Sequence, residues 1–174
     1  MPNFKTHIIS GIIAFPLFFL IFNLIYSYFF YDIYYVPSEI FASFLLFVLG
    51  SDFPDVDHHN AFINKFFRLF LVIGSVYYIF DYKQIFIEQF NLSSNISSFL
   101  IIVVGILIGM ILGFIFNKLT KHRGMWHSII TGVVISVLIY FLNFKYRSPI
   151  NLFYSLNFFV GFSLHLLLDK VHKN

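Results

Sequence analysis

The chain has no cysteine among its 174 residues. It therefore forms no disulfide and has no thiolate metal site, so any bound metal must use nitrogen and oxygen ligands. Charged residues are also scarce, at 11% of the chain, while 59% of the residues are hydrophobic. Together with a mean hydropathy of +0.85, this excludes an ordinary soluble domain and indicates a membrane protein. The net charge of +3 is small and scattered, so we expect no nucleic-acid partner.

Long apolar runs are what the chain does contain, and a membrane-crossing helix needs ~20 apolar residues. The sequence predicts an all-α, polytopic membrane bundle of about six transmembrane helices, folded as a single domain over residues 1–174. The second run is short for a full crossing, so it is either tilted or dips into the bilayer at its end. We expect the first run to be retained, because it is longer than the apolar core of a signal peptide. The six runs are residues 5–30, 38–51, 66–80, 99–117, 126–143 and 150–169, with a polar connection over 81–98.

Glycine recurs every fourth residue in the fourth run, at Gly105, Gly109 and Gly113. This small-xxx-small pattern is typical of a helix face that another helix approaches closely. We interpret it as a packing surface.

The distribution of lysine and arginine predicts the orientation in the membrane. Cytoplasmic segments of membrane proteins carry an excess of these residues, and six crossings with both termini cytoplasmic place eight of the eleven on that side. The eleven tyrosines then fall in or near the outer ends of the runs, where interfacial tyrosine is common. We expect a multi-pass protein of a prokaryotic inner membrane. The cytoplasmic residues would be Lys5, Lys65, Arg68, Lys118, Lys121, Arg123, Lys170 and Lys173.

A cluster of acids and histidines follows the second run. Three carboxylates and two imidazoles fall between Asp52 and His59. Pro54 lacks a backbone N–H, so it ends the preceding helix and places the carboxylates on a turn. Aspartate oxygen and histidine nitrogen both bind Zn, Mn or Fe. The alternative is a loop of solvated charges.

The other metal-type side chains lie on the same expected side of the membrane. His7 begins the first run, His122 and His127 lie between the fourth and fifth, and His165 and Asp169 end the sixth. His165 and Asp169 are four residues apart and share one helix face. Each histidine taken alone has another reading, an interfacial side chain bonded to a carbonyl, and we keep that reading for His59 and His172. Lys121 and Arg123 suit binding of a phosphate, or they simply follow the charge rule.

These motifs, in this order, resemble those of one known family. Pro54-Asp-Val-Asp-His58, His122-Arg-Gly-x-x-His127-Ser128 and His165-x-x-x-Asp169, preceded by His7, resemble the YdjM-type inner-membrane proteins, which are regarded as metal-dependent hydrolases. That family is considered distantly similar to zinc-dependent phospholipase C and the single-strand zinc nucleases. Trp126 and Asp52 depart from the family pattern. The resemblance implies eight metal ligands: His7, Asp55, Asp57, His58, His122, His127, His165 and Asp169.

Eight candidate ligands exceed the four that one tetrahedral zinc accepts, so we expect two or three divalent ions. Zinc is the first choice, with manganese or iron next. The expected function is hydrolysis of a phosphoester in a lipid or another amphiphile at the cytoplasmic face, with Asp55 or Asp57 as the base and Lys121 and Arg123 binding the substrate. The alternative is a metal-binding membrane protein without turnover: a transporter, a sensor or a structural bundle. A transporter is disfavoured because the centres of the runs lack ionisable residues.

Overall fold

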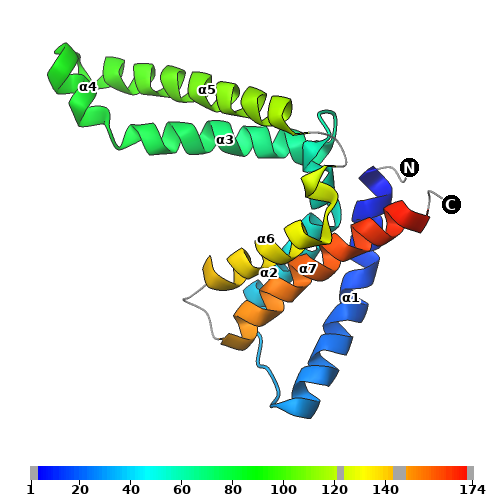
Figure 1. Ribbon diagram of the computed structural model, residues 1–174. Coiled ribbons are helices and arrows are strands. Elements are labelled where there is room, and N and C mark those ends of the chain that lie inside the picture. The colour runs from blue at the N-terminus through cyan, green and yellow to red at the C-terminus, as the bar shows by residue number, and fades with distance from the viewer. Residues whose placement is uncertain (1–3, 121–123, 143–147, 172–174) are drawn as a thin grey trace. The chain divides into compact units, whose positions relative to one another are not determined.

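The computed structural model describes residues 4–120, 124–142 and 148–171. Every regular element in these ranges is a helix, as expected (Figure 1). The order is α1 (Phe4–Phe29), α2 (Pro37–Asp52), the 3-10 turn η1 (Phe53–Asp57), α3 (Phe62–Phe80), α4 (Lys83–Phe90), α5 (Ser94–Leu119), the 3-10 turn η2 (Met125–His127), α6 (Ile129–Leu142) and α7 (Ser148–Val171).

Four helices are long and apolar enough to cross a membrane, namely α1 from Lys5 onwards, α3, α5 and α7, and α6 is a shorter apolar helix. The apolar runs therefore predicted helices, but the number of six crossings stays a prediction. One local detail differs from expectation, because the polar connection contains the short helix α4.

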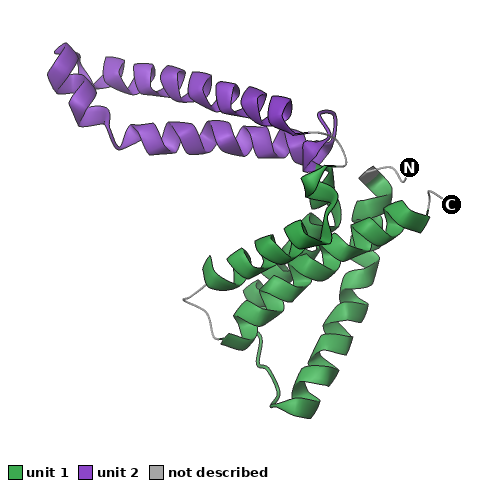
Figure 2. Cartoon of the chain, in the orientation of Figure 1, with its two compact units in different colours: residues 1–55, 123–174 green, residues 56–122 purple. Residues whose placement is uncertain are grey.

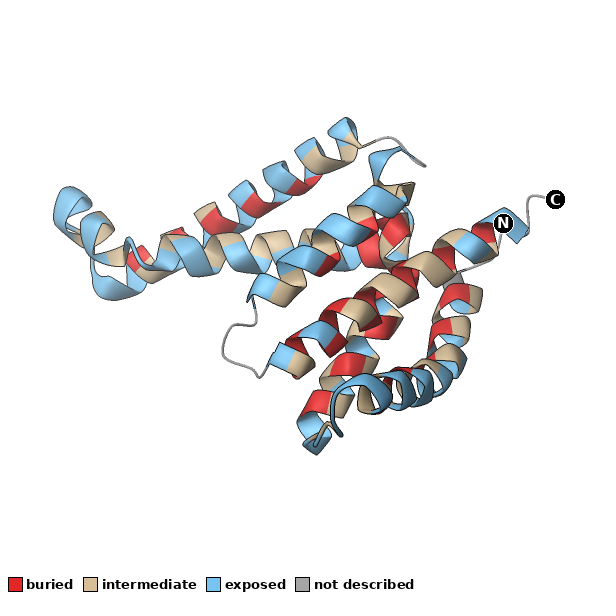
Figure 3. Cartoon of the chain, turned by 60° about the horizontal axis from the view of Figure 1, so that its bottom comes forward, coloured by how far each residue is buried: buried red, intermediate tan, exposed pale blue. Residues whose placement is uncertain are grey.

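The chain divides into two compact units, residues 1–55 with 123–174 and residues 56–122 (Figure 2). In the first unit α7 packs against α2, α6 and α1, and α1 also packs against α2. Its core is largely phenylalanine, with Phe47, Phe153 and Phe162 almost fully buried. Helix α7 carries buried residues along most of its length (Figure 3).

Close backbone approach complements this aromatic core. Lipid tails are as apolar as leucine, so membrane helices associate through packing and hydrogen bonds rather than through a hydrophobic driving force. A Cβ on Gly50 would overlap the Phe158 carbonyl oxygen, and one on Gly161 would overlap the Phe47 carbonyl oxygen. The two glycines therefore allow α2 and α7 to touch backbone to backbone.

The second unit is an antiparallel hairpin of α3 and α5. A Cβ on Gly105 or Gly109 would lie within 3 Å of the Val76 or Val72 backbone, and one on Gly113 would contact the Arg68 side chain. The three glycines thus form a packing surface against α3, as the sequence predicted. Asn64 joins the two helices by donating from Nδ2 to Asn117 Oδ1 at 2.8 Å and to the Val56 carbonyl at 2.7 Å.

Candidate metal centre

The candidate site of the first unit is built on the last turns of α7. His165 and Asp169 lie four residues apart on this helix and therefore share a face. His165 is fully buried and Asp169 is 9% exposed. A buried imidazole next to a buried carboxylate is costly unless the two groups have partners, so the site depends on what the neighbouring segments bring to them.

The beginning of α1 supplies the first partner, His7, which is 1% exposed. Its Nε2 lies 3.6 Å from Asp169 Oδ1, and its ring stacks on that of His165 with centroids 3.8 Å apart and planes inclined by 16°. The beginning of α1 and the end of α7 accordingly lie together (Figure 1).

The 3-10 turn η1 supplies the second partner, Asp55. Pro54 falls inside this turn and α2 ends at Asp52, so the carboxylate stands on a turn as the sequence predicted. Asp55 Oδ1 lies 3.4 Å from His127 Nε2 and 3.7 Å from His165 Nε2.

The 3-10 turn η2, which precedes α6, supplies the third partner, His127. Besides facing Asp55, its Nε2 lies 4.0 Å from Asp169 Oδ2, and its ring meets that of His165 at 69° with centroids 5.5 Å apart. Four segments far apart in the sequence therefore converge on one cluster: His7, Asp55, His127, His165 and Asp169.

Two groups of three in this cluster could hold a metal ion: His7, His165 and Asp169, and Asp55, His127 and His165. Within each group the ligand atoms lie within 4.8 Å of one another. The nitrogen–oxygen separations of 3.4 to 4.0 Å are at or beyond the long limit of a hydrogen bond. Two ligand atoms ~2.0–2.1 Å from a tetrahedral ion lie roughly 3.3–3.5 Å apart. The separation of 3.4 Å between Asp55 Oδ1 and His127 Nε2 falls in this range, and the other three, from 3.6 to 4.0 Å, are longer.

A backbone group fixes which nitrogen of His165 faces the cluster. Its Nδ1 lies 2.8 Å from the Ser51 carbonyl oxygen. A carbonyl only accepts, so Nδ1–H donates and Nε2 carries the lone pair that binds a metal. Nε2 is buried and finds no hydrogen-bond partner in the part of the chain that the structure describes. This orphaned atom fits a metal ligand.

No motif in the sequence points to Ser51 as a partner of His165. Its carbonyl reaches His165 because α2 and α7 touch at Gly50 and Gly161. Gly50 and Gly161 are the only residues of the sequence that relate to this contact, and a single glycine in a helix does not by itself predict close packing against another helix.

The charge on Asp55 suits the same role. Burial by itself would raise the pKa of this carboxyl, but the His127 ring 3.4 Å away and the nearby His165 and His7 rings hold it below its usual range. Asp55 is therefore an anion over the physiological range. By contrast, burial and then the Asp55 carboxylate raise the pKa of Asp52 to about 7.

The remaining predicted residues lie outside the described part of the first unit. Asp57 and His58 belong to the second unit, where Asp57 is fully buried and His58 is half-buried. His122, Lys121 and Arg123 lie outside the described residues. Ligation by Asp57, His58 and His122, and substrate binding by Lys121 and Arg123, stay predictions.

Long apolar helices and a buried histidine–aspartate cluster of metal-binding type define a class, the helical membrane proteins with a candidate metal centre at their helix ends. The family follows from the whole sequence. The chain belongs to the YdjM inner membrane protein family, whose model matches residues 1–174. No curated protein and no solved structure matches it.

Proposed function

We propose that this inner membrane protein is a metal-dependent hydrolase that cleaves a phosphoester of a lipid or another amphiphile. The observation that supports this most is the buried Nε2 of His165, which faces Asp55 without a hydrogen-bond partner among the described residues. A buried polar atom left in this way is costly in a purely structural bundle.

The residues that would hold the ion are the five of the cluster. Nδ1 of His165 is engaged by Ser51, so this histidine can serve one ion only, through Nε2. The two groups of three share it, so they describe one centre rather than two. A second ion, which the eight predicted ligands imply, would need Asp57, His58 or His122.

A bound divalent ion supplies Lewis acidity, lowering the pKa of water towards ~7 and polarising a phosphoryl oxygen. Zinc is the first choice because the donors are nitrogen and oxygen, with manganese or iron next. The chain supplies the rest. Asp55 or Asp57 accepts the proton of the attacking water, whose oxygen joins phosphorus. The ester P–O bond breaks, the leaving oxygen takes a proton from solvent, and Lys121 and Arg123 neutralise the charge that develops.

The depth of the site motivates the substrate class. In the proposed topology the cluster lies where helices leave the hydrocarbon on the cytoplasmic side, which is the level of lipid phosphates. The eight lysines and arginines assigned to that side support this orientation.

The test is an activity screen of detergent-purified protein against phosphodiester, phosphomonoester and lipid substrates, with and without chelator. We expect metal-dependent turnover that falls by at least about a hundredfold in His127→Ala and Asp169→Ala. His59→Ala is the control, because we assign His59 no role. If the protein turns over none of the substrates while metal is still bound, the result would contradict hydrolysis and favour a role as a transporter, a sensor or a structural bundle.

A further inference from the structure

The second unit carries a feature that the metal centre does not use, a groove on one face of the α3–α5 hairpin. Its first stretch is a hollow of about 340 Å³. Arg68 and Asn117 lie among its lining residues, and the others include Leu69, Val72, Met110 and Phe114. The hollow thus combines two polar side chains with an otherwise apolar lining.

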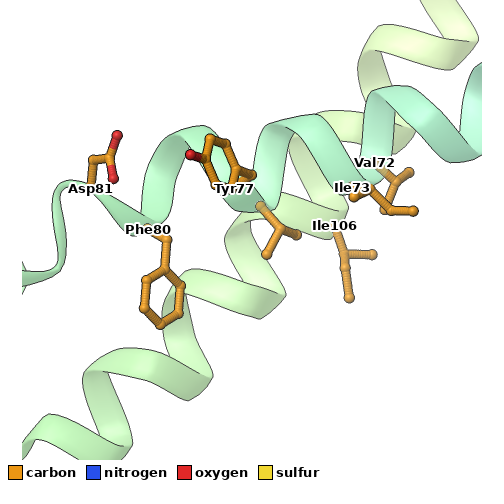
Figure 4. Close-up of a pocket in the computed structure, with 7 residues that line it drawn as sticks. Val72, Ile73, Tyr77, Phe80, Asp81 and Ile106 are labelled. Carbon is orange, nitrogen blue, oxygen red and sulfur yellow. The ribbon is translucent and has the colours of Figure 1, made fainter. Parts of the chain in front are cut away.

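A second hollow, of about 520 Å³, shares Val72 with the first and extends it along α3. Leu69, Val72, Val76 and Phe80 recur at intervals of three or four residues, so the two hollows lie on one face of α3. Figure 4 shows the second hollow, with Val72 and Ile73 at one end and Phe80 and Asp81 at the other. From Arg68 to Phe80 the helix rises ~18 Å, close to the ~15 Å depth of one hydrocarbon leaflet.

The charge of the hairpin is one-sided. The described helices α3 and α5 contain no aspartate or glutamate, and their three cations, Lys65, Arg68 and Lys118, all lie at the end where α3 begins and α5 ends. The other end has the tyrosines Tyr77 and Tyr78 of α3. Such an arrangement matches an anionic membrane surface at the cationic end.

Arg68 differs from the two lysines because it lines the groove. It lies six residues into α3, about 9 Å from the helix start. Its side-chain carbons lie along Gly113, and its buried Nε has no partner among the residues that the structure describes. A cation at this depth in a membrane helix is expensive without a counter-charge.

Asn117 adds a second donor. Its Oδ1 already accepts from Asn64, so its amide N–H groups are what it offers to the groove. Two donors beside an apolar channel one leaflet deep suit a molecule with an oxyanion at one end and a hydrocarbon chain behind it.

We propose that this groove binds one anionic phospholipid of the cytoplasmic leaflet, with its phosphate at Arg68 and Asn117 and an acyl chain along Val72 to Phe80. A free phosphate would leave the apolar channel unfilled, and a neutral lipid would leave the Arg68 charge less compensated. The proposal does not depend on the metal centre or on hydrolysis.

The test is native mass spectrometry of the full chain in detergent, titrated with phosphatidylglycerol and with phosphatidylcholine of identical acyl chains. We expect one tightly bound phosphatidylglycerol, held on the order of tenfold more tightly than phosphatidylcholine, and no retained inorganic phosphate. Arg68→Gln removes this preference, whereas the matched control Lys65→Gln, at the same end of α3 but outside the groove, keeps it.

A second pair of variants tests the channel. Ile73→Trp fills the groove and weakens binding of both lipids. Leu71→Trp, on the opposite side of α3 and lining a different hollow, does not. Equal effects of Arg68→Gln and Lys65→Gln would show that the lipid preference comes from general surface charge, and would overturn the proposal. Equal effects of the two tryptophan substitutions would also overturn the proposal. A dimer that Ile73→Trp dissociates would show that a second copy of the chain occupies the groove, and this too would overturn it.

Discussion

At the residue scale, one hydrogen bond decides how the cluster can work. The Ser51 carbonyl accepts from His165 Nδ1 at 2.8 Å, which leaves Nε2 facing Asp55. Outer partners of this kind orient metal-binding histidines and raise their basicity. The stack of His7 on His165 restricts the same ring from its face. His165 is thus held in one orientation before any ligand arrives.

Asp52 gives a prediction about pH. Burial, and next the Asp55 carboxylate, raise its pKa from 3.8 to about 7. Since the folded pKa exceeds the unfolded one, the folded protein binds more protons between about pH 4 and pH 7, and stability falls as the pH rises through that window. Asp52→Asn should therefore match the wild type near pH 5 and melt at a higher temperature than the wild type near pH 8.

Thermal unfolding of chelator-treated protein in detergent measures this, with the exposed Asp81 changed to Asn as the control. A variant with the same advantage at both pH values would show that Asp52 does not ionise in this range.

At the element scale, the contact of α2 with α7 positions the cluster. Gly50 and Gly161 let the two backbones touch, and this brings the Ser51 carbonyl to His165. The same device, three glycines of α5 against α3, builds the hairpin of the second unit. Helix spacing in this protein is set mainly by glycine positions.

Gly161→Ala tests that dependence. The added methyl overlaps the Phe47 carbonyl and must push α7 from α2, at a cost of about 1–3 kcal/mol in stability. We expect metal affinity to fall by roughly 10- to 100-fold as well, because the Ser51 bond to His165 lengthens.

Gly74→Ala is the matched control, because a Cβ there meets nothing within 4 Å and the exchange favours the helix. Unchanged metal affinity in folded Gly161→Ala would separate helix spacing from the site.

The sequence predicted those structural elements that depend on residues close together in the chain. Apolar runs located the long helices, Pro54 located the turn that carries Asp55, and the glycine spacing located the packed face of α5. The four-residue spacing paired His165 with Asp169. The Ser51 contact and the stack of His7 on His165 depend on how distant helices meet, which no local pattern encodes. The sequence did not predict helix α4, because half of its eight residues are polar or charged and it is too short to form an apolar run.

At the scale of the whole molecule, orientation decides which face the metal centre serves. The prediction is six crossings with both termini cytoplasmic. Because the chain has no cysteine, each introduced cysteine is a unique label. Cysteine at position 32 should react with an impermeant maleimide added to intact cells, whereas cysteines at 60 and 121 should react only after permeabilisation. External labelling at 60 or 121 would reverse the orientation and move the site to the other face.

The proposed function requires that the buried histidine–aspartate cluster binds a divalent metal. The most direct measurement is elemental analysis of the protein purified without chelator, beside His165→Ala and the control His59→Ala. We predict at least one equivalent of a transition metal in the wild type and in His59→Ala, and its loss in His165→Ala. Less than about one equivalent in the wild type, or full retention in His165→Ala, would show that the cluster is not a metal site.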